Sequence, residues 1–230
     1  MPQSLNKKIN VQIENAIETY VHNLDNFKNI ADNLTNDLME NEDLRKLIHS
    51  IKVRKKDPKH LKDKLERIAR RNLSEKKPFR ITAENLFSQI NDLAGIRILH
   101  LHTKQMLEIH PAVLKVFREH FWTLIRKPVA YTWDIENKAF FQTLGIKAVF
   151  IPSQYTSVHY ILKPKRETPM TCELQIRTLM EEVWGEVSHV INYPYETKNV
   201  HCKEQLRVLA RIASGCTRLV DSIFESHKTK

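Results

Sequence analysis

Residues 92–99 read DLAGIRIL, an acid followed by a short, mostly apolar run near the middle of the chain. Asp92 stands directly before seven residues of which five are Leu, Ile or Ala and only Arg97 is charged. A short, continuous apolar run of this kind is typical of a strand in the middle of a sheet. An acidic residue at the mouth of such a strand lies where side chains of neighbouring strands converge, although capping a turn or helix is its more common role. The stretch therefore predicts a buried β-strand with a candidate site at its beginning.

Further β-rich runs alternate with helical patterns on both sides of this stretch. The five strand candidates are residues 95–101, 129–135, 147–151, 157–163 and 170–177. Helical spacing of apolar residues intervenes over 104–121 and follows over 179–191. This alternation predicts an α+β (α/β-like) fold, with a mixed β-sheet of about five strands flanked by helices.

Both ends of the chain have the spacing of amphipathic helices. Apolar residues recur at helical intervals over 9–38, which fits one long helix with at most one break, and again over 203–224. A further helix is expected to begin at Pro58, and residues 72–80 are expected to form a loop.

These patterns predict three regions along the chain. We expect an N-terminal helical arm over 1–45, a central domain over 46–195, and a C-terminal helix over 196–230. The last helix is expected to pack on the core or to mediate assembly into a homo-oligomer.

The positive charge of the chain is concentrated in one segment. The net charge is +10, and residues 45–80 hold 15 Lys or Arg against 4 Asp or Glu, which leaves the rest of the chain close to neutral. A segment of this kind is expected to face a polyanion, either a nucleotide or an RNA such as tRNA. The ordinary alternative is a helix face that is simply solvated. Lys64 differs from its neighbours because it lies beside the apolar stripe of its helix, from which its ammonium group can reach a cleft.

The composition excludes several classes of protein. Only four glycines are present, and neither GxGxxG nor GxxxxGK[ST] occurs, so Rossmann and Walker-type phosphate loops are excluded. Three cysteines without CxxC spacing support neither a disulfide framework nor a cysteine zinc site. No run approaches the roughly 20 apolar residues that span a bilayer. We therefore expect a cytoplasmic protein that makes no membrane contact.

Two strand candidates carry polar side chains on one face. Alternation places Glu173, Gln175 and Arg177 together on one strand, and Tyr155, Ser157 and His159 together on another. Taken alone, each set is more often a solvent-facing surface or simple packing. Taken together they favour a cleft, in which Tyr155 stacks on a nucleotide base and His159 reaches phosphate or ribose.

Two carboxylates from different strands are candidate metal ligands. Mg²⁺ usually takes one or two protein carboxylates and fills its other positions with water and substrate phosphates. Asp92 and Glu173 suit this ion, and the cations of the basic segment suit the phosphates.

Four ordered motifs resemble the RelA/SpoT alarmone synthetase family, in its small, synthetase-only form. The pattern R-x-K, a proline two residues later and a second lysine is met by Arg54, Lys56, Pro58 and Lys64. The pattern D-[LI]-A-G-[IV]-R is met in full from Asp92 to Arg97. Most of G-Y-x-S-x-H is met by Tyr155, Ser157 and His159, and all of E-x-Q-[IV]-R-T by Glu173, Gln175, Arg177 and Thr178.

The resemblance implies a nucleotidyltransferase-like synthetase fold and a specific reaction. The family moves the β,γ-pyrophosphate of ATP to the ribose 3′-hydroxyl of GDP or GTP, which gives (p)ppGpp and AMP with Mg²⁺ as the cofactor. The implied roles are ATP binding by Arg54, Lys56 and Lys64; metal binding by Asp92 and Glu173; catalysis by Glu173, Asp92 and Gln175; and acceptor binding by Tyr155, His159, Ser157 and Arg177.

The loop before Tyr155 departs from the family pattern. Many members have a lysine, an asparagine and a glycine there, whereas this chain has Ile151-Pro152-Ser153-Gln154. The acceptor therefore stays open between a guanine nucleotide, an adenine nucleotide and the 3′ end of tRNA. A catalytically silent RNA-binding module is a third alternative, and the intact Asp92 and Glu173 count against it.

Overall fold

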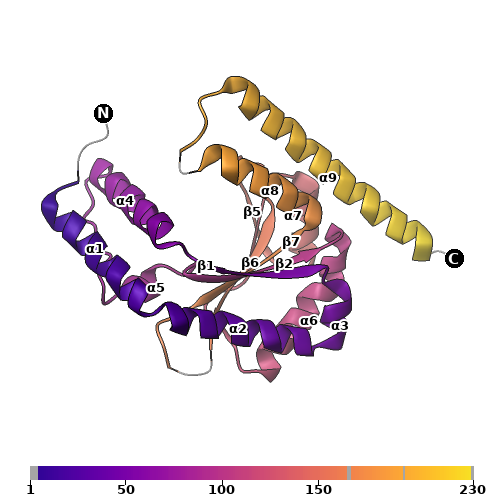
Figure 1. The fold of residues 1–230 in the computed structure, drawn as a ribbon. Helices are drawn as coiled ribbons and strands as arrows, with labels where there is room; N and C mark the ends of the chain where they lie inside the picture. The colour runs from indigo at the N-terminus through magenta and orange to yellow at the C-terminus, as the bar shows by residue number, and fades with distance from the viewer. Residues whose placement is uncertain (1–4, 165–166, 194, 229–230) are drawn as a thin grey trace.

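The computed structural model describes residues 5–164, 167–193 and 195–228, which form helices on both sides of one mixed sheet (Figure 1). The helices are α1 (Lys7–His22), α2 (Leu24–Glu40), α3 (Glu42–Leu47), α4 (Pro58–Ser74), α5 (Leu86–Gln89), α6 (Met106–Glu119), α7 (Ile135–Thr143), α8 (Leu179–Asn192) and α9 (Val200–Lys228), with a 3₁₀ turn η1 (Thr103–Gln105) before α6. No helix in these ranges is long and apolar enough to cross a membrane.

The described residues contribute seven strands to the sheet. They are β1 (Ser50–Lys55), β2 (Ala94–His100), β3 (Thr123–Leu124), β4 (Val129–Thr132), β5 (Lys147–Phe150), β6 (Ser157–Lys163) and β7 (Cys172–Thr178). The order is β1-β2-β7-β6-β4-β5, and β3 pairs with β6 outside this path. The pairs β2–β7 and β4–β5 are parallel and the others antiparallel, which confirms the expected mixed sheet and the α+β class.

Several expected boundaries were wrong. The sequence predicted neither β1 nor β3, so the sheet is larger than the expected five strands. The run over 129–135 ends as a strand at Thr132, because Asp134 caps the N-terminus of α7 by accepting hydrogen bonds from the backbone N–H groups of Glu136 and Asn137 at 2.9 and 3.1 Å. Helix α4 continues to Ser74, into the expected loop. The pattern over 9–38, by contrast, forms two helices that meet at Asn23, which is the single break that the sequence allowed.

The main core lies between the N-terminal helices and one face of the sheet. Helix α2 crosses beneath β1, β2 and β7, with α3 and α6 beside it (Figure 1). The largest fully buried side chains include Tyr20, Phe27 and Tyr160. The hydroxyl of Tyr20 donates to the backbone carbonyls of Lys56 and Leu93 at 2.7 and 3.2 Å. These bonds tie α1 to the ends of the two strand segments that carry the first two motifs.

Helices α8 and α9 lie over the opposite face of the sheet. Trp184 of α8 packs with Ala210 and Ala213 of α9 in a smaller apolar cluster that Tyr155 and Leu209 border. Because this second layer covers only part of the sheet, polar side chains on that face of β1, β2 and β7 stay open to a cleft.

Candidate active site

A cavity of about 1060 Å³ lies between the polar face of β1, β2 and β7 and the helices α8 and α9. Strand register explains which side chains meet in it. Gly95 on β2 is level with Arg54 on β1 and Glu173 on β7. Two residues further along, Arg97 is level with Lys52 and Gln175. Side chains at paired positions of neighbouring strands point to the same face, so the motifs converge as expected. Gly95 has no side chain to fill the space between Arg54 and Glu173.

Asp92 lies between two lysines at one end of the cleft. Lys56 Nζ donates to its Oδ2 at 3.0 Å, and Lys64 Nζ reaches its Oδ1 from α4 at 2.6 Å. Burial favours the neutral acid, but the charges of Lys56 and Lys64 and their hydrogen bonds outweigh it and lower the pKa of Asp92. The carboxylate is therefore ionised at neutral pH. Arg54 lines the same cavity as Lys56 and Asp92. Lys64 does not line the cavity and is connected to it only through its bond to Asp92.

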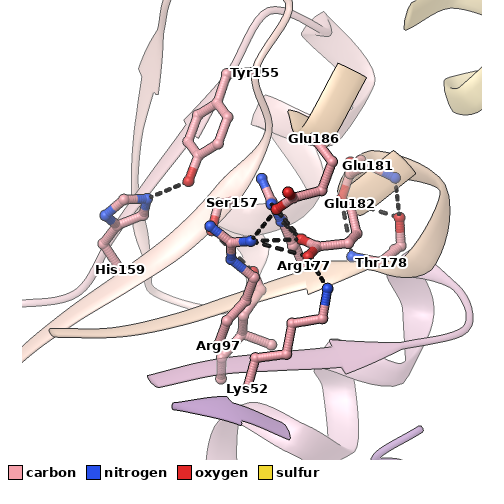
Figure 2. Close-up of polar contacts among 11 residues, drawn as sticks. Lys52, Arg97, Tyr155, Ser157, His159, Arg177, Thr178, Glu181, Glu182 and Glu186 are labelled. Atoms are coloured by element: carbon pink, nitrogen blue, oxygen red, sulfur yellow. Dashed lines mark hydrogen bonds and ion pairs between the residues drawn. The ribbon is translucent and has the colours of Figure 1, made fainter. Parts of the chain in front are cut away.

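Glu173 belongs to a chain of hydrogen bonds that leads to Tyr155. His159 Nδ1 lies 2.8 Å from Glu173 Oε1, and Gln175 Nε2 donates to Oε2 at 2.8 Å. A carboxylate only accepts, so Nδ1 is the donor to Glu173, and His159 Nε2 lies 3.0 Å from the Tyr155 hydroxyl (Figure 2). Burial opposes ionisation of Glu173, but these bonds and the charge of His159 lower its pKa, while the charge of Asp92 acts the other way.

The remaining candidates differ in their access to the cleft. Ser157 does not line the cavity; it is buried, and its hydroxyl donates to the Ile176 carbonyl at 3.4 Å. Arg177 lines the cavity but is almost fully buried, and its guanidinium carbon lies 5.7 Å from the centre of the Tyr155 ring. Arg177 therefore supports Tyr155 from behind through a cation–π contact.

A buried acid organises three cations on the floor of the cleft, and the sequence did not predict this. Glu182 of α8 accepts from Lys52 Nζ at 2.8 Å, Arg97 Nη1 at 2.9 Å and Arg177 Nε at 2.6 Å (Figure 2). Burial opposes its ionisation, but the hydrogen bond from Lys52 and the charges of Arg177 and Arg97 lower the pKa of Glu182 to about 2. Arg97 also donates to Glu186 at 2.8 Å. The sequence held one indication of this cluster: Glu182 and Glu186 follow the last motif at i, i+4 spacing, which puts both carboxylates on one face of a helix.

The threonine that ends the last motif sets the start of α8. Thr178 Oγ1 accepts from the Glu181 N–H at 3.3 Å, and the Thr178 N–H donates to Glu181 Oε2 at 3.1 Å. This capping box begins the helix directly at the end of β7, which brings Glu182 back over the strands (Figure 2). Burial raises the pKa of Glu181 to about 7.

Two further groups of cleft residues lie beyond the motifs. At the end of α8 the rings of His189 and Tyr193 stack 4.8 Å apart, and His60 of α4 meets Tyr193 edge-on at 4.4 Å. Helix α9 adds the second group, which consists of Lys203, Leu206 and Arg207. Trp184 Nε1 holds this helix by donating to the Leu206 carbonyl at 3.0 Å.

Residues 53–198 match the protein family described as the region found in RelA / SpoT proteins. The small alarmone synthetase 1 of Bacillus subtilis, in a structure bound to its product pppGpp, has a TM-score of 0.65 at 18% identity, over 92% of this chain and 99% of that one. A GTP pyrophosphokinase family protein of Streptococcus pneumoniae has a TM-score of 0.63 at 19% identity, over 93% of each chain. The Bacillus subtilis enzyme bound to AMPCPP has a TM-score of 0.58 at 17% identity, over 89% of this chain and 95% of that one. Among curated proteins no sequence matches.

Proposed function

Because the chain belongs to the RelA/SpoT family, we propose that it transfers the β,γ-pyrophosphate of ATP to the ribose 3′-hydroxyl of GDP or GTP, giving (p)ppGpp and AMP. The observation that carries this proposal is the division of one cleft into two ends. The Lys56–Asp92–Lys64 cluster and Arg54 lie at one end and Tyr155 at the other, with Glu173 connected to Tyr155 through His159. Pyrophosphate transfer between two nucleotides needs a site for the phosphates, a site for the acceptor's nucleobase, and a carboxylate between them that can accept from the attacking hydroxyl.

The donor ATP is assigned to the end with the lysines. Lys56 and Lys64 would neutralise the triphosphate, and Arg54 would stack on adenine or bridge phosphate oxygens. Both lysines are already directed by Asp92, so their ammonium groups are held in place before ATP arrives. Holding charged groups in position beforehand reduces the cost of ordering them during the reaction.

The donor set fits a magnesium ion. Asp92 and Glu173 come from neighbouring strand ends, and both have lowered pKa values. The charge of Asp92 nevertheless disfavours ionisation of Glu173. A cation between them would reduce this repulsion between the two carboxylates. When bound, the ion would offset the negative charge on the transferred phosphate oxygens. The protein supplies the two carboxylates and the directed lysines.

Glu173 is assigned to the attacking hydroxyl. Its lowered pKa makes it a weak base, so its first role is to accept a hydrogen bond from the ribose 3′-hydroxyl and hold that oxygen in line with the β-phosphorus. The new bond joins the 3′-oxygen to the β-phosphorus while the bond from the β-phosphorus to the α-phosphate oxygen breaks and AMP leaves. The hydroxyl proton passes to Glu173 late in this step, because the transition state of phosphoryl transfer is loose and places little demand on a strong base.

Tyr155 is assigned to the acceptor base. Its ring is fixed by Arg177 behind it and by the hydrogen bond to His159, so it offers a rigid platform for stacking. Pro152, Ser153 and Gln154 line the same end of the cavity. Since this loop lacks the lysine and asparagine of many family members, an adenine nucleotide or a tRNA 3′ end is the second candidate acceptor.

One assay tests the reaction and the acceptor together. The purified protein is incubated with Mg²⁺ and ATP labelled on the γ-phosphate, and GDP, GTP, ADP, ATP or deacylated tRNA is offered in turn. We expect AMP release in step with transfer of label to GDP or GTP. Label on ADP, ATP or tRNA alone would establish the second candidate instead. Absence of AMP with every acceptor would contradict both.

A further inference from the structure

The basic segment, residues 45–80, holds more cations than the cleft uses. Lys52, Arg54 and Lys56 line the cavity, and Lys64 reaches it through Asp92. The other cations of this segment lie outside the cavity. Their charge therefore needs an explanation other than the binding of one nucleotide.

Every acid in the basic segment already has a partner. Asp57 caps α4 by accepting from the N–H groups of Lys59 and His60. Asp63 accepts from the Tyr193 hydroxyl at 3.3 Å. Glu66 accepts from Arg70, and Glu75 accepts from Lys77. Asp57 and Asp63 accept from neutral donors and keep their charge, but four acids can offset at most four of the 15 cations in the segment.

Over residues 55–80, seven cations outside the cavity have exposed side chains that make no side-chain hydrogen bond or ion pair with any described residue. We call them the outer cations, and they are Lys55, Lys59, Lys62, Arg67, Arg71, Lys76 and Arg80. Four of them lie on α4, whose buried stripe of Leu61, Leu65 and Ala69 faces the protein. The remaining three lie in β1 and in the chain after α4.

The length of α4 over which the outer cations are spread is enough for several phosphates of one strand. At 1.5 Å per helical residue, the distance along α4 from Lys59 to Arg71 is about 18 Å. At 3.4 Å per phosphate, one strand of nucleic acid places about five phosphates along such a length. Helix α4 carries four of the outer cations over this length, spread over about half of its circumference at 3.6 residues per turn. The helix lies at the rim of the molecule beside α1 (Figure 1).

We propose that the outer cations form a binding surface for the phosphate backbone of RNA. A membrane is the poorer fit, because an interfacial surface needs apolar anchors among its cations. Val53 and Leu73 are the only large apolar side chains of this segment that are exposed, whereas nine of the others among the described residues lie on α8 and α9. RNA is favoured over DNA because the outer cations begin at Lys55, next to the cleft residue Lys56, and that cleft is proposed to take a ribonucleotide. RNA binding itself does not depend on transfer activity.

Salt dependence of RNA binding tests the surface. A fluorescein-labelled 20-nucleotide RNA is titrated with the full chain and followed by fluorescence anisotropy between 50 and 300 mM NaCl. For single strands, log K falls with log salt by about 0.7 for each phosphate neutralised. Reversing Lys59, Lys62, Arg67 and Arg71 to Glu is therefore expected to lower the slope by about 3 and to weaken binding more than tenfold at 150 mM salt.

A matched control variant has the same net charge as the α4 variant but keeps the outer cations. Reversal of Lys8, Arg118, Lys127 and Lys147, which are exposed and lie outside the segment, changes the charge by the same amount and should leave the slope near that of the wild type. Replacing the four α4 cations by Gln, with melting curves for all variants, covers the case in which charge reversal impairs folding. AMP release by each variant is measured separately, so loss of RNA binding is distinguished from loss of transfer.

Three results would overturn the proposal. The first is equal RNA binding by the wild type and by the α4 variants. The second is equal affinity for a DNA of the same sequence, which would remove the assignment to RNA. The third is binding to vesicles of phosphatidylcholine and phosphatidylserine in place of RNA.

Discussion

Glu182 and Arg177 form a buried ion pair beneath the cleft, in which Arg177 Nε donates to Glu182 Oε2 at 2.6 Å. The Arg177 side chain is 3% exposed and the Glu182 side chain 7%, and the same carboxylate also accepts from Lys52 and Arg97. Removing Glu182 would leave Arg177 buried with only the more distant Glu186, 3.9 Å away, as a counter-charge. The stability of the fold and the position of the cleft cations therefore depend on the ionisation of Glu182.

The first prediction concerns acid unfolding. The pKa of Glu182 is about 2 in the folded protein and 4.5 without these contacts, so its contribution to the free energy of unfolding is present above pH 4.5 and is lost as the pH falls toward 2. Glu182→Gln should lower the free energy of unfolding by about 3 kcal/mol at pH 7 and flatten its decline between pH 5 and 2. Urea unfolding at several pH values measures both. As a control, Glu186→Gln changes an exposed side chain and should lower the free energy of unfolding by less than about 1 kcal/mol. Equal effects of the two variants would contradict the stabilising role given to Glu182.

The second prediction concerns the attacking hydroxyl. Glu173→Gln keeps the size of the side chain and removes the negative charge, so turnover should fall at least about 100-fold while ATP binding changes by less than about threefold. AMP release and ATP titration by calorimetry measure the two quantities. Glu119→Gln on α6 is a control with an exposed carboxylate far from the cleft. Turnover near that of the wild type would remove Glu173 from its proposed role.

The third prediction separates two roles of Asp92. Asp92→Asn releases Lys56 and Lys64 from their counter-ion, so ATP without metal should bind several-fold more tightly. The concentration of Mg²⁺ that gives half-maximal turnover should rise at least about tenfold, because a ligand of the ion is lost. Nucleotide binding in EDTA and a Mg²⁺ titration of AMP release test these opposite effects. An unchanged Mg²⁺ requirement would argue against metal binding by Asp92.

The fourth prediction distinguishes the ring of Tyr155 from its hydroxyl. Tyr155→Ala should raise the acceptor KM about tenfold or more, because stacking on one base contributes about 1–3 kcal/mol. Tyr155→Phe keeps the ring and loses only the bond to His159, so its acceptor KM should change less than about threefold, with any larger effect in kcat. Steady-state kinetics with GDP or GTP at saturating ATP measure this. Equal KM values for both variants and the wild type would exclude stacking.

The sequence predicted the parts of the cleft that depend on strand periodicity. Alternation along β7 correctly placed Glu173, Gln175 and Arg177 toward one face, and the apolar run after Asp92 correctly indicated a central strand. Strand β1 was not predicted because it is an edge strand with mostly exposed side chains, so it lacks the apolar run that indicates a buried strand.

The contacts of α8 could not be predicted from local patterns. Glu182 meets Arg97 and Lys52 across 85 and 130 positions of sequence. These residues, far apart in the sequence, come into contact because the capping box at Thr178 starts α8 so that the chain turns back over the sheet. Ser157 and His159 share a strand face as expected, but packing buries the hydroxyl of Ser157 against the neighbouring strand.

The two lysines bonded to Asp92 have a consequence for the speed of nucleotide capture. Before any ligand arrives, Lys56, Asp92 and Lys64 already cancel all but one unit of their charge. A nucleotide that enters here exchanges partners with groups that are already paired, so the long-range attraction on it comes from Arg54 and the outer cations and not from these two lysines. The association rate of ATP should therefore fall as ionic strength rises, although the phosphate site itself is ordered before the encounter.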